Sequence, residues 1–124
     1  MIVADTDVLI DFLARVQPAT HQVAEYIAAD QLQPTAVNYF ELLSRAGENK
    51  RGLAVRQLLE SLSVLQLDRA AAEHAADVRR KLERTGRKIG MGDTLIAGIA
   101  LAHDMPLLTR NKSHFERVEN LKFA

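Results

Sequence analysis

Three acidic residues that lie far apart in the sequence, Asp5, Glu41 and Asp93, are the first candidates for chemistry. Asp5 follows the apolar run Met1–Ala4, and a carboxylate at the end of a buried strand loses hydration and needs a cation or several hydrogen-bond donors. Glu41 interrupts the apolar run Val37–Leu43, where an exposed helix face and a functional site explain it equally well. Asp93 could simply cap a helix. A common site is therefore a hypothesis that depends on whether the three acids meet.

Carboxylates of this kind, joined by an amide such as that of Asn111, form a hard-oxygen site of the type that binds Mg²⁺ or Mn²⁺. Mg²⁺ in such a site keeps several waters, and a metal-bound water loses its proton more readily and can attack phosphorus. The ion also neutralises charge that builds up on a phosphate. An acidic cluster without a basic nucleophile beside it thus indicates metal-assisted hydrolysis of a phosphodiester.

The elements that must position these acids are short apolar segments that alternate with longer helical patterns. Such alternation is typical of βαβ units and predicts a mostly parallel sheet with helices on both faces. We expect five strands, at Met1–Ala4, Gln31–Thr35, Ser63–Leu67, Pro106–Thr109 and Leu121–Phe123. We expect helices over Val8–Leu13 with a cap at Thr6 or Asp7, from Thr20 onward, over Ala36–Arg45, over Leu53–Leu62, from a cap at Asp68 to Arg84, and over Asp93–His103.

The order of these elements brings the candidate residues to one edge of the sheet. In open parallel sheets, ligands bind outside the carboxyl ends of the strands. Asp5 ends the first strand, and Thr109 ends the fourth strand with Asn111 just beyond it. Asp93 begins the helix that leads into the fourth strand. We therefore expect separate segments of the chain to deliver oxygen ligands to the same place.

The composition limits the classes of protein to which the chain can belong. Its 124 residues predict a single domain over residues 1–124 whose core needs no covalent cross-links. The absence of cysteine excludes disulfides, thiol catalysis and cysteine-ligated zinc, and it suits a reducing compartment. The 16 basic and 16 acidic residues give a net charge of zero, so nucleic acid would have to bind to a local patch. We find neither a signal peptide nor an apolar run long enough to cross a bilayer, and we expect a soluble cytoplasmic protein.

Four segments of the chain carry a recognisable pattern: VADTDVLIDFL, NYFELLSR, GDTLIAGIALAH and LLTRNKSHFERV. In this order and at this spacing, over nearly the whole chain, they resemble the PIN-domain nucleases, and in particular the VapC-type toxins of toxin–antitoxin pairs. The resemblance implies a single-domain α/β/α sandwich with a mostly parallel five-stranded sheet. It implies a Mg²⁺-dependent endoribonuclease, for which Mn²⁺ could substitute. It also implies three partners: an RNA substrate, a VapB-like antitoxin and a second copy of the chain in a homodimer.

The resemblance assigns roles to individual residues of this sequence. Asp5, Glu41 and Asp93 match the catalytic acids of the family, and Asp5 and Asp93 are the expected metal ligands. Thr6 and Thr109 match small hydroxyl residues that orient the carboxylates or the phosphate.

One departure from the family pattern concerns the segment after the fourth strand. Many members carry a fourth acid there, whereas this chain has Asn111 and His114. Asn111 can still offer a carbonyl oxygen to the catalytic site and His114 could orient a water, but neither brings negative charge. We therefore expect one firmly bound ion, and a PIN-fold protein that binds RNA with little catalytic activity is an alternative.

Two other families share parts of the pattern. The first segment also resembles the haloacid-dehalogenase phosphatases, but the later motifs of that family would stand in the wrong order here. In a signalling receiver domain, Asp5 and Asp7 would follow the first strand and Asp68 would accept the phosphate. Against the receiver domain, the long helix after Asp68 favours a helix cap at that position. Receiver domains also carry a lysine after the start of the fifth strand, whereas Lys122 stands almost at the end of this chain.

The densest basic stretch precedes Asp93 and could hold RNA through its phosphates. A solvated helix face explains the same pattern, because Asp77 and Glu83 are interspersed among the basic residues. The basic residues of this stretch are Arg79, Arg80, Lys81, Arg84, Arg87 and Lys88.

Overall fold

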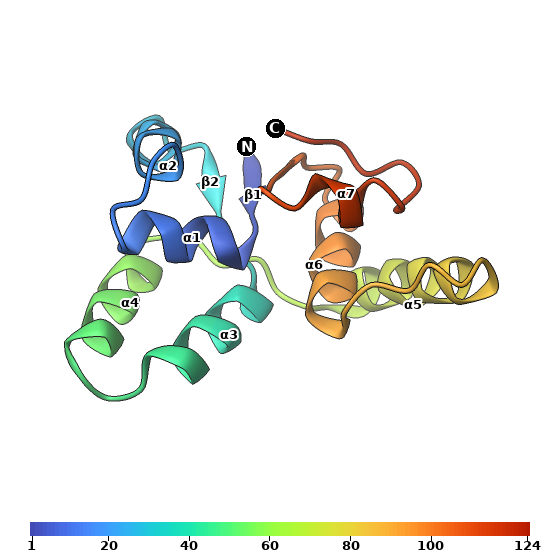
Figure 1. Ribbon diagram of the computed structural model, residues 1–124, viewed down its shortest axis with the longest axis horizontal. Coiled ribbons are helices and arrows are strands. Elements are labelled where there is room, and N and C mark those ends of the chain that lie inside the picture. The colour runs from blue at the N-terminus through green and yellow to red at the C-terminus, as the bar shows by residue number, and fades with distance from the viewer.

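The side chains of the first strand alternate between two hydrophobic clusters. In the computed structural model, which describes all 124 residues, β1 (Ile2–Ala4) places Val3 in one cluster and Ile2 and Ala4 in the other. Successive side chains of a strand point to opposite faces of a sheet, and all three of these residues are buried. Such a strand needs helices on both faces, as in a parallel α/β fold. Figure 1 shows this arrangement, with the strands between two groups of helices.

Five segments of the chain run parallel to one another in the sheet. β2 (Leu32–Gln33) and β3 (Leu107–Leu108) pair with opposite edges of β1, in the order β2-β1-β3. Two outer segments join through one parallel bridge each, Thr35 with Leu65 and Leu107 with Phe123. The prediction of a parallel sheet built from five segments is confirmed, although the third and fifth segments form bridges instead of full strands.

The third and fifth segments are shorter than expected because few backbone groups can pair there. Pro34 accepts a hydrogen bond from the Leu65 amide but has no N–H to donate, so the ladder beside the third segment ends at once. Phe123 lies at the outer edge of the sheet, where the pairing is limited to bonds that Leu107 makes with the neighbouring Lys122 and Ala124. The expected strands Ser63–Leu67 and Leu121–Phe123 are therefore too long.

Seven helices connect and cover these strands. They are α1 (Thr6–Leu13), α2 (Ala19–Ala28), α3 (Ala36–Ala46), α4 (Lys50–Glu60), α5 (Arg69–Arg84), α6 (Met91–Ala102) and α7 (Lys112–Phe115). The predicted Asp68 cap of α5 and the predicted end of α3 at Gly47 are confirmed. α4 begins earlier than predicted, because the side chain of Asn49 caps it. No helix combines the length and the hydropathy that a membrane span requires.

The starts of α1 and α6 differ from the prediction in a way that affects the acids. The side chain of Asp5 accepts a hydrogen bond from the Thr6 amide, so Asp5 caps α1, and the expected cap at Thr6 or Asp7 is wrong. α6 begins after the N-cap Gly90, which places Asp93 inside the first turn, where it makes no cap hydrogen bond. The interpretation of Asp93 as a simple helix cap is therefore wrong as well.

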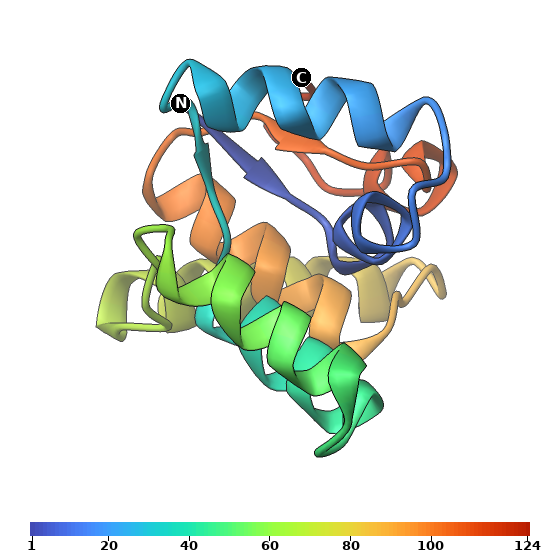
Figure 2. The same ribbon diagram turned by 90° about the vertical axis from the view of Figure 1, so that its left-hand side faces the viewer.

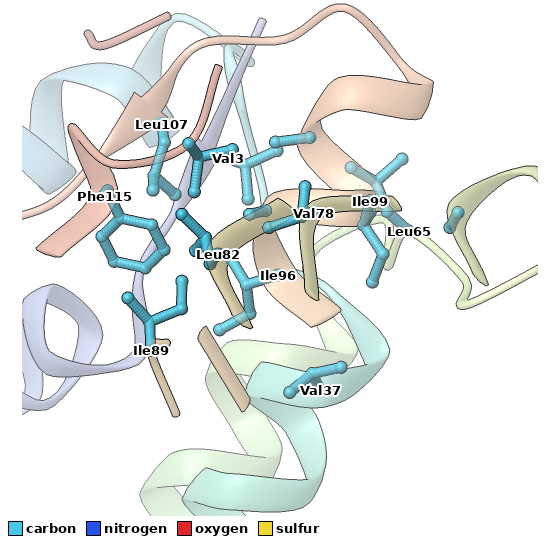
Figure 3. Packing of buried hydrophobic residues seen from close by; sticks show 14 residues of the cluster. Val3, Val37, Leu65, Val78, Leu82, Ile89, Ile96, Ile99, Leu107 and Phe115 are labelled. Atoms are coloured by element: carbon cyan, nitrogen blue, oxygen red, sulfur yellow. The ribbon is translucent and has the colours of Figure 1, made fainter. Parts of the chain in front are cut away.

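The helices form two layers, and α3 lies where the layers meet. α1, α2 and α4 pack on one face of the sheet, and α5, α6 and α7 pack on the other (Figures 1 and 2). Figure 3 shows the hydrophobic core between the sheet and α5, α6 and α7, which contains Val3, Leu107 and Phe115. α3 contributes Val37 to this core and Leu42 to the other. The residues between them on α3, which include Glu41, are thereby held at the junction of the two layers.

The helices α5 and α6 approach each other closely at Gly98. A Cβ atom at this position would lie 2.6 Å from the Cβ of Ala75 and 2.7 Å from the carbonyl oxygen of Ala71. Only glycine permits this contact without a backbone shift. The close contact fixes α6 against α5 and thereby fixes the position of its first turn, which carries Asp93.

Candidate active site

Asp5 lies at the turn between β1 and α1, and its carboxylate is almost completely enclosed. Its Oδ1 accepts a hydrogen bond of 2.8 Å from the Thr6 amide, and its Oδ2 accepts one of 2.9 Å from the Thr109 hydroxyl. Its exposed fraction is only 4%. Two donors thus hold both oxygens of a buried carboxylate in one orientation.

Burial raises the pKa of Asp5 from 3.8 to about 6. The hydrogen bond from Thr109 opposes this rise, and the negative charge of Asp93 adds to it. The neighbouring charges that act on the pKa of Asp5 are those of Asp93 and Asp7, and both are negative. The negative charge of the ionised Asp5 is therefore only partly stabilised by the protein. A carboxylate in this condition gains most from binding a cation.

The substitution Thr109→Val should raise the pKa of Asp5 further, because it removes a hydrogen bond to the ionised form. It should also lower the free energy of unfolding by about 1–3 kcal/mol, since the amide of Asn111 loses its acceptor, the Thr109 hydroxyl. NMR titration of the Asp5 carboxyl group and denaturant unfolding measure the two effects. Thr109→Ser keeps the hydroxyl and serves as the control. An unchanged pKa in Thr109→Val would show that the hydrogen bond does not stabilise the ionised form.

Asp93 and Glu41 approach Asp5 from two different helices. Burial raises the pKa of Asp93, the negative charge of Glu41 raises it further, and His114 lowers it in part. Glu41 lies against the first turn of α6, because its Oε2 is 2.7 Å from the position that a Cβ of Gly92 would occupy. In Figure 1 the starts of α1, α3 and α6 surround the end of β1 at which Asp5 lies. The structure therefore brings the three predicted acids together at the carboxyl edge of the sheet.

The hydroxyl of Thr6 connects the first acid motif to Glu41. Thr6 Oγ1 donates to Glu41 Oε1 at 2.6 Å and accepts from Asn38 Nδ2 at 2.8 Å. Thr6 thus contacts one of the acids directly, as the resemblance implied for a carboxylate-orienting residue. Asn38 is buried and was not among the predicted site residues, although the spacing of Thr35 and Asn38 is that of a capping box at the start of α3.

Asn111 is linked to the acids indirectly, through Thr109 and His114. Its amide donates to Thr109 Oγ1, the hydroxyl that also holds Asp5, at 2.9 Å. Its Nδ2 lies 2.9 Å from Nδ1 of His114, which in turn affects the pKa of Asp93. The negative charge of Asp7, which the sequence suggested as a helix cap, raises the pKa of both Asp5 and Asp93. No sequence signal separates Asp7 from an ordinary first-turn acid.

The basic stretch over the end of α5 and the loop that follows it is partly neutralised by neighbouring acids. Arg79 pairs with Glu83, Arg80 with Asp77, and Lys81 with both Asp77 and Glu119. The remaining cations of this stretch, which form no ion pair, are Arg84, Arg87 and Lys88. A surface hollow of about 690 Å³ between α5 and the segment 117–120 contains Arg84 and Arg87 but none of the three acids. The full basic patch that the sequence suggested is thus reduced to three free cations.

The acids form an open set of ligands. No three carboxylate or imidazole side chains lie close enough together to enclose a metal ion by themselves. Mg²⁺ does not require such an enclosure, because it is commonly held by one or two carboxylates and several waters. The buried Asp5 and the half-buried Asp93 fit that type of site. Their like charges repel each other when both are ionised, and a cation between them would relieve this repulsion.

The sequence and the fold are similar to those of known proteins. A family model described as PIN domain matches residues 2–121. The chain belongs to the PIN domain family. Ribonuclease VapC10 of Mycobacterium tuberculosis is 35% identical over 124 residues, which cover 98% of this chain and 91% of the relative. The tRNA(fMet)-specific endonuclease VapC of Shigella flexneri is 32% identical over 122 residues, with coverage of 95% and 92%. The solved structure of VapBC-1 from nontypeable Haemophilus influenzae has a TM-score of 0.84 at 27% identity and covers 100% of this chain and 97% of the solved one.

Membership of the PIN domain family confirms the resemblance to VapC-type proteins and the predicted α/β/α fold. It also excludes the receiver-domain and dehalogenase hypotheses. In this PIN domain, Asp68 serves as the cap of α5, where its Oδ1 accepts a hydrogen bond of 2.9 Å from Ala71. The catalytic and metal-binding roles of Asp5, Glu41, Asp93 and Asn111 stay predictions.

Proposed function

We propose that this PIN domain is a metal-dependent endoribonuclease and the toxin of a toxin–antitoxin pair in the cytoplasm. The observation that carries the proposal is the convergence of Asp5, Glu41 and Asp93 at one sheet edge, where burial raises the pKa of Asp5 to about 6. Two relatives that bear the names ribonuclease and endonuclease support RNA as the substrate.

Asp5 and Asp93 are the residues that would hold Mg²⁺, with Mn²⁺ as a substitute. Thr6 and Thr109 orient the oxygens of Asp5 for this role through their hydrogen bonds. The side-chain oxygen of Asn111, which accepts no hydrogen bond within the fold, offers a neutral ligand at the same edge. The bound ion would supply a water of lowered pKa and would neutralise charge on the scissile phosphate.

Glu41 is suited to take a proton from the attacking water. Its Oε1 accepts a hydrogen bond from Thr6, whereas its Oε2 accepts none and lies beside Gly92 in the first turn of α6. The positive end of the α6 dipole favours negative charge at this point. A carboxylate that is fixed through one oxygen and free at the other can act as a general base at the free oxygen.

Three partners belong to the proposal. RNA would contact the free cations Arg84, Arg87 and Lys88 through its phosphates, which gives binding that does not depend on sequence. A VapB-like antitoxin would hold the protein inactive, and a second copy of the chain would complete a homodimer. Similarity to VapBC-1 supports the antitoxin.

An RNA-cleavage assay with Mg²⁺, Mn²⁺ or EDTA tests the proposed function. We expect cleavage with either metal, none with EDTA, and none with Asp5→Asn or Asp93→Asn in the presence of Mg²⁺. Both variants pass through the same purification and therefore reveal any contaminating ribonuclease. Cleavage that survives EDTA or either substitution contradicts the mechanism.

A PIN domain that binds RNA without cutting it is the second candidate function. The observation that favours it is the presence of Asn111 and His114, two side chains in contact that bring no negative charge, where many relatives of the family carry a fourth acid. The same assay separates the two candidates when RNA binding is measured in parallel. Binding without cleavage under all metal conditions favours the second candidate.

The cleavage rate at low Mg²⁺ concentration should rise with pH through a midpoint of about 6, because Asp5 must lose its proton before it can bind a cation. A cation favours the ionised carboxylate, so a higher Mg²⁺ concentration should move the midpoint to lower pH. Rate profiles at two Mg²⁺ concentrations measure this shift. A midpoint that does not depend on Mg²⁺ contradicts the role of Asp5 as a ligand.

A further inference from the structure

The side-chain amide of Asn38 has only one possible orientation. Its Oδ1 accepts hydrogen bonds from the backbone N–H of Thr35 at 2.7 Å and from the Thr35 hydroxyl at 2.8 Å. A backbone N–H can only donate, so the atom that faces it must be the amide oxygen. The amide nitrogen then faces the other way, where Nδ2 donates to Thr6 Oγ1 at 2.8 Å.

This orientation determines the direction of the Thr6 hydroxyl. Thr6 Oγ1 already accepts a hydrogen bond from Asn38, and it lies 2.6 Å from Glu41 Oε1. A hydroxyl has one proton, and Glu41 is the acceptor within reach of it. The short distance is typical of a hydroxyl that donates to a carboxylate. The result is a chain of donors that runs from Thr35 through Asn38 and Thr6 to Glu41.

The chain of donors is sealed from water. Thr35 and Asn38 are 0% exposed and Thr6 is 4% exposed, so no solvent molecule can replace a lost partner. The chain also joins the residue that follows β2 to α3 and α1, which fixes the three elements relative to one another. Only Glu41 Oε2 lies outside the chain, on the side of α6.

We propose that Asn38 is a positioning residue for Glu41. Its amide donor sets the direction of the Thr6 hydroxyl, and that hydroxyl holds Glu41 Oε1 so that Oε2 stays available to the reacting groups. The effect of this chain on catalysis rests on the proposed function, whereas the chain itself does not. Asn38 also caps α3, but the cap uses its Oδ1 and backbone amide, and the chain to Glu41 uses Nδ2.

The substitution Asn38→Asp separates the two roles, because it keeps an acceptor for Thr35 and replaces the donor to Thr6 by an acceptor. We expect kcat for RNA cleavage to fall by about 10- to 100-fold with little change in KM, as is common for residues that orient a catalytic group. In a Glu41→Gln background the same substitution should cause no further loss. A purely structural role would lower kcat in both backgrounds, and that result overturns the proposal.

Two variants of Thr6 test the same chain without a change in the cap of α3. Thr6→Val removes the hydroxyl, and Thr6→Ser keeps it. We expect Thr6→Ser to retain a kcat about tenfold higher than Thr6→Val. Equal kcat values for the two variants overturn the proposal, and they do so even if Asn38→Asp fails to fold.

The metal-free protein gives a readout that does not depend on activity. The ¹³C resonance of the Glu41 carboxyl group should shift in Asn38→Asp and in Thr6→Val, and it should stay close to its wild-type position in Thr6→Ser. An unchanged resonance in Asn38→Asp overturns the proposal. If the wild-type protein cuts no RNA, the proposed function fails while the resonance still decides whether Asn38 positions Glu41. If RNA is cut but Asn38→Asp has wild-type kcat, the positioning role fails and the proposed function stands.

Discussion

Asp5→Asn should abolish RNA cleavage and, at neutral pH, should make the protein more stable. Loss of a carboxylate ligand that also orients the site should lower kcat by at least about 10³-fold. The stability gain follows from the pKa of Asp5, which burial raises from 3.8 to about 6. Because the folded protein keeps this proton more tightly than the unfolded chain does, the stability falls as the pH rises from about 4 to about 6. The shift corresponds to a penalty on the order of 3 kcal/mol above that range, which an uncharged Asn avoids.

Denaturant unfolding of both proteins at acidic and at neutral pH measures this effect. The stability difference should be largest above pH 6 and should vanish below pH 4, where Asp5 is protonated in both states. Asp68→Asn is a matched control, because Asp68 is also a helix N-cap but is exposed. Asparagine is as good an N-cap as aspartate, so this control should leave both the helix and RNA cleavage unchanged. A loss of stability in Asp5→Asn at neutral pH contradicts the account.

The position of the acids could be predicted from the sequence because it follows from topology. Once Asp5 is recognised as the end of a buried strand and Thr109 as the end of another, a parallel sheet must bring them to the same edge. Their hydrogen bond of 2.9 Å joins residues that lie 104 positions apart in the chain. The fold class needed no more than the alternation of apolar segments with helical ones.

The local starts of the helices could not be predicted in the same way. Asp5, Thr6 and Asp7 are three consecutive residues, each of which is a good N-cap, so residue preferences cannot choose among them. The choice depends on where β1 ends, because the cap must have extended backbone angles, and Asp5 has them with φ −71° and ψ 154°. The link from Asn38 to Glu41 was likewise out of reach, since it depends on contacts between α1 and α3 that no local pattern encodes.

Gly92→Ala should lower RNA cleavage strongly while the fold stays intact. A Cβ at this position would lie 2.7 Å from Glu41 Oε2, so the carboxylate must move away from the first turn of α6. The displaced atom is the end of a flexible side chain, so the movement costs the fold little. Alanine also favours helix over glycine by up to about 1 kcal/mol. We therefore expect kcat to fall by about 10- to 100-fold, as for loss of a well-positioned general base, with a melting temperature equal to or above that of the wild type.

Gly90→Ala provides the matched control for this prediction. It lies two residues earlier at the N-cap of α6, and a Cβ there would meet no atom within 4 Å. The control should keep wild-type cleavage, because it leaves Glu41 in place. In a Glu41→Gln background, Gly92→Ala should cause little further loss of activity, since the side chain that it displaces no longer accepts a proton. A wild-type kcat in Gly92→Ala would contradict this prediction. It would mean that Oε2 of Glu41 does not have to lie beside the first turn of α6 during the reaction. The role of Glu41 as the general base would then have to be abandoned.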